Sequence, residues 1–354
     1  MKNRIFNLSL LAIASATLVN CSSNDDSTET NNNSGLYKEV LTDLSNDVIT
    51  DTYEELNLKA TALKTAVNAL TIGDETALTA VKEAWKATRS PWEQSEGFLY
   101  GPVDTGGIDP AMDTWPVDVN AMDAILNGST PITPATLEQN EEARGFHLIE
   151  YLVWGVNGNK SASALTTREL EYLRAAAQDL QNNTQLLYDG WKVSGGNFAN
   201  HFINAGTTGN DGYASQKDAL EEIVNGMITI ADEVSTGKIQ TPLDEGVSTE
   251  ESRFSNNSKK DFADNMRSIK NIYLGDFNGN NASGLTDIVA PSNSQLDTNM
   301  KAKIDAAINA IEAIPGTFTN AVTSNRAAVE NARDKVAELQ LFIQSQLKPF
   351  IANH

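Results

Sequence analysis

Apolar residues recur at the spacing of an α-helix along almost the whole chain, and this periodicity restricts the fold more than any other feature. In residues 36–70, for example, leucine, valine and tyrosine side chains return on one helical face. No segment shows the sustained alternation of apolar and polar residues that is typical of a half-buried strand. The sequence therefore predicts an all-α protein in which each helix buries one face.

The helices are expected where apolar residues keep the spacing of a helix. Thr166 and Glu169 have the spacing of a capping box and predict where one of these helices begins. A polar, Gly-rich run at 194–211 separates the helices into two groups and predicts two helical-bundle domains, 36–200 and 201–354. The expected helices cover residues 36–70, 76–100, 117–126, 134–153, 166–193, 216–236, 259–274, 292–313 and 324–350.

Residues 101–116 contain three glycines and three prolines, a density of breakers that argues against any helix there. The same stretch also carries Ile108, Met112 and Trp115 among four interleaved aspartates of residues 104–118. Because it is too apolar for an exposed tether, we expect an ordered loop that packs over a site.

The N-terminus has the features of an export signal. Residues 1–20 combine the basic Lys2 and Arg4 with a short apolar run, and Cys21, the only cysteine, follows directly. This pattern resembles a bacterial lipoprotein signal, so we expect residues 1–20 to be removed and Cys21 to be lipidated. Residues 21–35 are polar and predict a flexible tether.

The cell envelope is therefore the expected location. No Asp follows Cys21 directly, which favours the outer membrane, with the periplasmic or external face left open. A formal net charge of −21 argues against binding to nucleic acid and favours cations. A single cysteine allows no disulfide within the chain, so stability must come from packing.

His147 and Glu150 are the most informative polar residues, because they lie three positions apart inside an apolar run. Residues three apart on a helix point the same way. An unpaired imidazole or carboxylate in a buried face would cost about 1–3 kcal/mol or more, so a metal ion or polar partners must meet them.

Glu93 and Glu96 have the same spacing and would also share a helix face. Facing His147 and Glu150 across a bundle, they would supply three carboxylates and one imidazole, a set that suits one divalent iron, zinc or manganese ion. In the alternative interpretation Glu93 and Glu96 are surface acids, and His147 and Glu150 bond to each other or to Arg89 and Arg144.

Two further patterns have simpler explanations. Residues 276–287 are similar to a calcium-binding EF-hand loop, but Asn281 stands where the loop needs Gly and Asp287 where it needs Glu, which favours a turn. The five tryptophans, Trp85, Trp92, Trp115, Trp154 and Trp191, are expected mainly in the core.

Three stretches together resemble the imelysin-like family, which is also classed as M75 peptidases and is related to periplasmic iron-uptake proteins. Residues 145–150 read Gly-Phe-His-Leu-Ile-Glu and resemble its GxHxxE signature. Residues 89–98 with Gly101 and Pro102 resemble its first-bundle motif, and residues 251–255, with Asp261 and residues 268–275, its second-bundle motif. The resemblance implies a two-domain all-α fold with a site at the GxHxxE helix.

Three functions remain open. The first is a metal-binding envelope lipoprotein in iron uptake, with His147, Glu150, Glu93 and Glu96 as ligands and iron-transport proteins as partners. The second is a metallopeptidase in which Glu150 or Glu96 is the general base, although no second His of a zincin motif is present. The third is a non-enzymatic module that binds a polysaccharide or protein through residues 101–116.

Overall fold

Helices make up the regular structure of residues 33–354, the part of the chain that the computed structural model describes, and no strand occurs among these residues. The predicted all-α class is confirmed. The first helix begins at Ser34, two residues before the expected start. The expected signal peptide and Cys21 lie outside the described residues.

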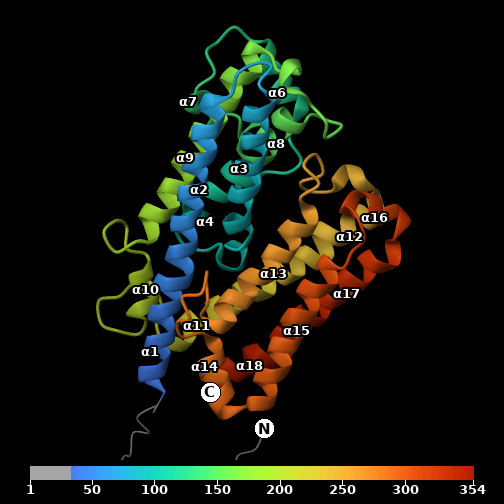
Figure 1. The fold of residues 1–354 in the computed structure, drawn as a ribbon. Helices are drawn as coiled ribbons and strands as arrows, with labels where there is room; N and C mark the ends of the chain where they lie inside the picture. The colour runs from blue at the N-terminus through green and yellow to red at the C-terminus, as the bar shows by residue number, and fades with distance from the viewer. Residues whose placement is uncertain (1–32) are drawn as a thin grey trace, which may run out of the picture. The chain divides into compact units, whose positions relative to one another are not determined.

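The elements follow one another with short connections (Figure 1). In the N-terminal half they are α1 (Ser34–Asp43), η1 (Leu44–Thr50), α2 (Asp51–Ala69), α3 (Glu75–Glu93), η2 (Glu96–Phe98), α4 (Pro102–Thr105), α5 (Ile108–Asp113), α6 (Val119–Asn127), α7 (Pro134–Leu137), η3 (Glu141–Ala143), α8 (Gly145–Trp154), η4 (Ala162–Ala164) and α9 (Thr167–Trp191). In the C-terminal half they are α10 (Ala199–Ile203), α11 (Gln216–Asp232), η5 (Glu233–Ile239), α12 (Gln240–Glu245), η6 (Val247–Thr249), α13 (Ser258–Leu274), α14 (Leu285–Ser292), α15 (Ser294–Glu312), α16 (Phe318–Ser324), α17 (Arg326–Phe342), η7 (Ile343–Leu347) and α18 (Lys348–Asn353).

Local capping explains several helix starts. The predicted capping box of α9 is confirmed, because the Thr166 hydroxyl accepts from the Glu169 amide and the Glu169 carboxylate accepts from the Thr166 amide. The Asp74 carboxylate caps α3 in the same way, by accepting from the Ala77 amide. These contacts satisfy amide groups that have no partner within the helix.

The structure corrects three of the expected elements. Residues 101–116 are not free of helix, because α4 and α5 lie there; Pro102 occupies a first-turn position of α4, where its missing N–H costs nothing. The helix expected over 134–153 is interrupted between α7 and α8. The helix expected over 76–100 ends at Glu93, and a short 3-10 turn, η2, follows.

Helices from the two halves of the chain contact each other directly. In the N-terminal half α2 packs against α3 and α9, and in the C-terminal half α13 packs against α15 and α15 against α17. Between the halves, α3 packs against α13 and η2 against α11. Residues 34–354 form one compact unit. The division into bundles at about residue 200 stays a prediction.

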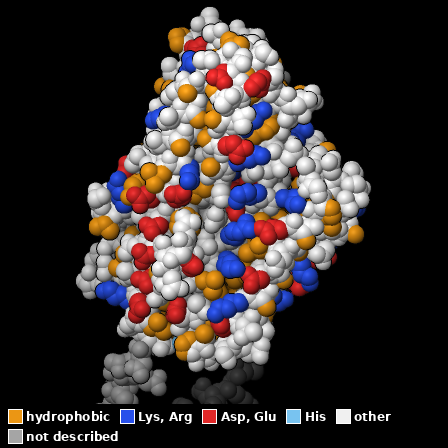
Figure 2. Space-filling model, in the orientation of Figure 1, with side chains coloured by type: hydrophobic (Ala, Val, Ile, Leu, Met, Phe, Trp, Pro, Cys, Tyr) orange, Lys and Arg blue, Asp and Glu red, His pale blue; other side chains and the backbone are white. Residues whose placement is uncertain are grey.

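The surface carries charges of both signs. Figure 2 shows Asp and Glu side chains spread over one face, with Lys and Arg gathered near its middle. Three cations of α13, Lys260, Arg267 and Lys270, each lie within ion-pair distance of a carboxylate. None of the described helices has the length and apolar character needed to cross a membrane.

Candidate metal site

The helix that carries His147 is held by glycines at both ends. Gly145 opens α8 with φ +78° and Gly155 follows it with φ +69°, backbone conformations that favour glycine. A Cβ on Gly145 would lie 2.2 Å from the Met112 carbonyl oxygen, so α8 and the end of α5 touch through backbone. This close approach brings His147 beside Asp113, the last residue of α5.

One ring nitrogen of His147 is fixed by Glu150. Its Nδ1 lies 3.1 Å from Glu150 Oε2, while Glu150 Oε1 accepts a 2.7 Å hydrogen bond from the Ser255 amide. Both side chains are fully buried. Glu150 therefore orients the imidazole through Nδ1, as carboxylates do for the histidine ligands of many metal sites.

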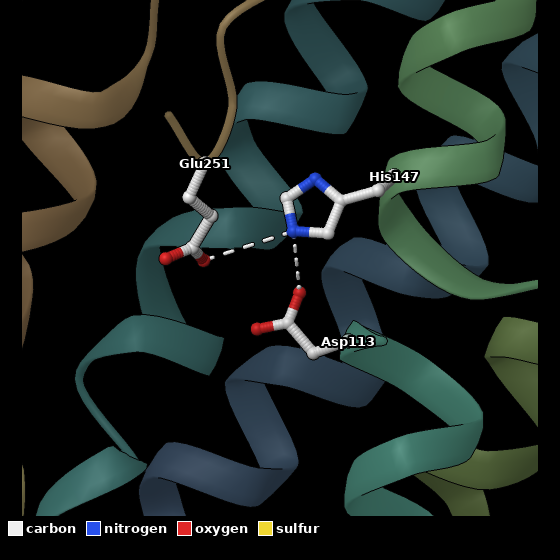
Figure 3. A group of neighbouring side chains, drawn as sticks. All are labelled: Asp113, His147 and Glu251. Atoms are coloured by element: carbon white, nitrogen blue, oxygen red, sulfur yellow. Dashed lines mark ion pairs between the residues drawn. The ribbon is translucent and has the colours of Figure 1, made fainter. Parts of the chain in front are cut away.

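The other ring nitrogen, Nε2, faces two carboxylates (Figure 3). It lies 3.1 Å from Asp113 Oδ1 and 3.7 Å from Glu251 Oε1, yet makes no hydrogen bond of regular geometry. The Trp115 ring packs edge-on against the imidazole at a centroid distance of 4.9 Å. Asp113, His147 and Glu251 each offer an atom within 4.8 Å of the others, a spacing that a metal ion could bridge.

Arg89 of α3 is fully buried against the same carboxylates. Its guanidinium contacts Asp113 Oδ1, Glu93 Oε1 and, at 2.7 Å, Glu251 Oε1. Its Nε lies 3.7 Å from Asp261 Oδ2 of α13. A carboxylate oxygen has two lone pairs, so Asp113 and Glu251 can accept from Arg89 and still bind an ion.

Glu93 and Glu96 meet a second cation, Lys238 of η5. The Lys238 Nζ lies 2.8 Å from Glu96 Oε2, 3.5 Å from Glu93 Oε2 and 3.2 Å from Glu251 Oε2. The Asn265 amide donates to Glu93 Oε2 at 2.6 Å and to Glu96 Oε2 at 2.9 Å. Glu93, Glu96 and Asp113 form a second group of carboxylates within 4.8 Å of one another.

Negative charge exceeds positive charge in this buried cluster, which we call the acidic cluster. Two permanent cations, Arg89 and Lys238, and the imidazole of His147 face five carboxylates: Glu93, Glu96, Asp113, Glu251 and Asp261. Burial acts to lower the pKa of His147, but Asp113, Glu150 and Glu251 raise it well above its ordinary value.

The imbalance appears in the titration of the carboxyls. Burial raises the pKa of Glu93 to about 8, although Arg89 and Lys238 oppose the effect, and burial raises the pKa of Asp261 to about 6. Burial also acts to raise the pKa of Glu251, but Lys238 and His147 hold it well below its ordinary value. The cluster thus holds more carboxyl groups than its own cations can keep ionised.

A cavity of about 480 Å³ reaches the acidic cluster. Glu96, Asp113, Glu251 and Lys238 lie on its wall, with Trp115 beside them. A volume of this size is typical of pockets for small ligands. Glu150 is not among the lining residues, and both of its oxygens are engaged elsewhere.

The structure brings the four predicted metal-site residues into one region but separates their roles. His147 presents Nε2 to the cluster, whereas Glu150 contacts the other ring nitrogen and the Ser255 amide. Glu93 and Glu96 do not share one α-helix, since Glu96 lies in η2, yet their carboxylates converge on Lys238. Arg144 does not join them, because it pairs with Asp179 through two hydrogen bonds.

Sequence reasoning missed Asp113, Glu251 and Lys238 as members of the site. Glu251 lies inside the stretch that resembles the second-bundle motif, and Asp113 lies in the Gly- and Pro-rich segment. Their partner, His147, is distant in sequence, so no local spacing could pair them. The signal for Asp113 was its position in a segment expected to cover a site.

The two simpler explanations hold in the structure. The Asp276 carboxylate accepts from the Gly279 amide and so closes a turn. Four tryptophans are buried, while Trp115 is partly buried and lines the cavity.

The fold and the site define a class: an all-α protein in which a buried imidazole and several carboxylates meet beneath a cavity. Residues 49–348 match Peptidase_M75, the imelysin family. The chain therefore belongs to the imelysin family, as the three stretches of sequence predicted.

Three similar proteins match this chain over most of their own length. The iron-regulated protein A of Synechococcus elongatus is 29% identical over 315 residues, which cover 86% of this chain and 84% of that protein. A crystal structure from Parabacteroides distasonis, of a protein with the provisional name iron-regulated protein A precursor, is 29% identical with a TM-score of 0.77 and covers 88% of this chain and 94% of its own. An imelysin-like protein from Psychrobacter arcticum, 16% identical with a TM-score of 0.73, shares the fold over 90% of this chain and 96% of its own.

Proposed function

We propose that this chain is a metal-binding lipoprotein of the cell envelope that acts in iron acquisition. The observation that carries the proposal is the fully buried Nε2 atom of His147, which faces the carboxylates of Asp113 and Glu251 at 3.1 and 3.7 Å. Once it has lost its proton, a nitrogen held between two carboxylates is a ready ligand for a metal ion.

The donor atoms suit a first-row metal. Ligands bound at about 2.0–2.2 Å from one ion lie about 3.0–3.5 Å from each other, and the separations of 3.1 and 3.7 Å from Nε2 are close to this range. One imidazole with carboxylates favours iron, zinc or manganese over calcium, which prefers oxygen ligands alone. A divalent ion held by Asp113, His147 and Glu251 would supply the positive charge that the acidic cluster lacks.

The role in iron acquisition takes its support from the relatives. The name of the Synechococcus relative states that it is regulated by iron, and the match covers most of both chains. For this chain we propose iron as the physiological metal and iron-transport proteins of the envelope as partners.

Metal titration tests the proposal. Calorimetry with Fe²⁺, Zn²⁺, Mn²⁺ and Ca²⁺ on residues 34–354, one compact unit, should show binding of at least one first-row metal that His147→Ala abolishes. His201→Ala is the matched control, because His201 is only partly buried and lies outside the cluster. Equal binding by the wild type and His147→Ala would refute the assignment.

The envelope location rests on the sequence of the N-terminus. The apolar run before Cys21 and the polar stretch after it support lipidation and an outer-membrane position. Labelling of cells with a radioactive fatty acid should mark the full-length protein and leave Cys21→Ser unlabelled. Label on both proteins, or on neither, would contradict the anchor.

A further inference from the structure

The ammonium group of Lys238 occupies a position where a metal ion could lie. It contacts one carboxylate oxygen of Glu96, one of Glu93 and one of Glu251, at 2.8 to 3.5 Å. Only 8% of its side chain is exposed, so these contacts replace its hydration almost completely. The three carboxylates therefore already form a binding position for a cation, with a cation of the chain inside it.

Two of the carboxylates around Lys238, Glu93 and Glu96, also belong to a group that could bind an ion without it. Glu93, Glu96 and Asp113 offer oxygens within 4.8 Å of one another. Glu93 is fully buried, and its Oε1 accepts no hydrogen bond of regular geometry although Arg89 lies against it. The Asn265 amide holds the other Glu93 oxygen and one oxygen of Glu96 in place, as a supporting residue does at a metal site.

The chemistry of this group differs from that of the His147 group. It supplies oxygen ligands only, which favours hard divalent cations such as Mn²⁺, Mg²⁺ and Ca²⁺. Asp113 belongs to both groups, so ions in both positions would share a carboxylate. Lys238, Glu96 and Asp113 all line the cavity of about 480 Å³, so solvent ions have a route to the position.

We propose that Lys238, whose ammonium lies against Glu93, Glu96 and Glu251, blocks a second cation site in which Asp113 joins Glu93 and Glu96, and thereby limits the chain to one bound metal ion. The first ion, at His147, belongs to the function proposed above, and this inference builds on it. A tethered ammonium competes with a free ion at very high effective concentration. Removing the ammonium while keeping the volume of the side chain should open the second site.

Four proteins separate the two sites: the wild type, His147→Ala, Lys238→Met and the double variant. Mn²⁺ is the probe because it accepts both ligand sets. Titration calorimetry and elemental analysis should give one ion per chain for the wild type, none for His147→Ala, two for Lys238→Met and one for the double variant. In Lys238→Met the paramagnetic resonance spectrum should also broaden, because two Mn²⁺ ions would lie close together.

Each result supports or overturns the second site. One ion in both the wild type and Lys238→Met, or none in the double variant, would overturn it. One ion in the double variant with none in the wild type would refute the metal site at His147 and support the site at Lys238. No binding by any of the four proteins would refute both.

Two further variants serve as a replacement and a control in this experiment. Lys238→Gln keeps a hydrogen-bond donor beside the carboxylates and replaces Lys238→Met if the latter does not fold, as judged by near-UV circular dichroism. Lys270→Met changes a partly exposed lysine on α13 that pairs with Asp305, and should leave the stoichiometry at the wild-type value. A second ion in Lys270→Met would show that the effect is not specific to position 238.

Discussion

At the scale of single residues, His147 and Glu150 have different roles although the sequence presents them as a pair. The imidazole faces the acidic cluster with Nε2 and Glu150 with Nδ1. Because Glu150 also accepts from the Ser255 amide, it fixes the ring against the segment that carries Glu251. We infer that Glu150 acts on a metal ion through His147 and is not itself a ligand.

Replacing Glu150 by Gln tests whether Glu150 supports His147 or binds the metal itself. Gln keeps the shape of the side chain and an oxygen for the Ser255 amide, but it removes the charge behind the imidazole. Loss of such a supporting carboxylate typically weakens metal binding about 10–100-fold. Calorimetry should therefore show reduced but measurable affinity in Glu150→Gln and no binding in His147→Ala. If Glu150→Gln also bound no metal, Glu150 would be a ligand after all.

At the scale of elements, the site depends on how α5 meets α8. The backbone of Gly145 lies against the Met112 carbonyl, one residue before Asp113. A side chain at position 145 would separate the two helices and so move Asp113 away from His147. The glycine of the GxHxxE stretch thus has a steric explanation in this chain.

Gly145→Ala should lower both stability and metal affinity. The positive φ of residue 145 costs a non-glycine residue about 1–3 kcal/mol, and the contact with Met112 adds to this. Urea denaturation should show the loss in unfolding free energy, and calorimetry the loss of affinity. Gly107→Ala is a control at another positive-φ position with open space around it, and should leave metal affinity unchanged. Wild-type affinity in Gly145→Ala would contradict the steric role.

A buried ion pair joins the start of α8 to α9. Arg144 donates to the two Asp179 oxygens at 2.6 and 2.7 Å, and Asp179 is 1% exposed. Removing one partner of a buried pair costs about 3–5 kcal/mol, because the other charge stays buried without compensation. Arg144→Ala should therefore be strongly destabilised in urea denaturation.

The destabilisation of Arg144→Ala should also depend on pH. Burial raises the pKa of Asp179 even with Arg144 present, and loss of the guanidinium raises it further. An acid whose pKa is higher in the folded chain than in the unfolded chain destabilises the fold at high pH and less as it takes up a proton. The loss of unfolding free energy in Arg144→Ala should therefore be smaller at acidic pH than at neutral pH.

Lys335→Ala is the control for a surface ion pair. It breaks an exposed pair with Glu338 and should cost at most about 1 kcal/mol of unfolding free energy.

At the scale of the whole molecule, the sequence predicted the helical class and the GxHxxE helix because both depend on local patterns. The capping box at Thr166 is local in the same way. The break between α7 and α8 was missed although the sequence marks it, because residues 138–142 are all polar and Gly145 follows them. Asp113, Glu251 and Lys238 were missed as site residues because tertiary packing alone brings them into the acidic cluster.

The acidic cluster joins distant parts of the chain. Arg89, Asp113 and His147 come from the N-terminal half, and Lys238 and Glu251 from the C-terminal half. An ion bound by Asp113, His147 and Glu251 would therefore link α5 and α8 to the segment that follows η6. Such a link forms only in the folded chain, so its binding energy adds to the stability of the fold.

Metal removal should therefore lower the melting temperature of the whole unit and not only empty the site. A ligand that binds only the folded state at a concentration 100 times its dissociation constant stabilises that state by about 2.7 kcal/mol. Calorimetric melting of residues 34–354 should show a higher midpoint with saturating metal than after chelation, in a single transition if the ion couples both halves. His147→Ala should melt at the same temperature with and without metal. A metal-dependent shift confined to one of two separate transitions would show that the ion stabilises only one half of the chain.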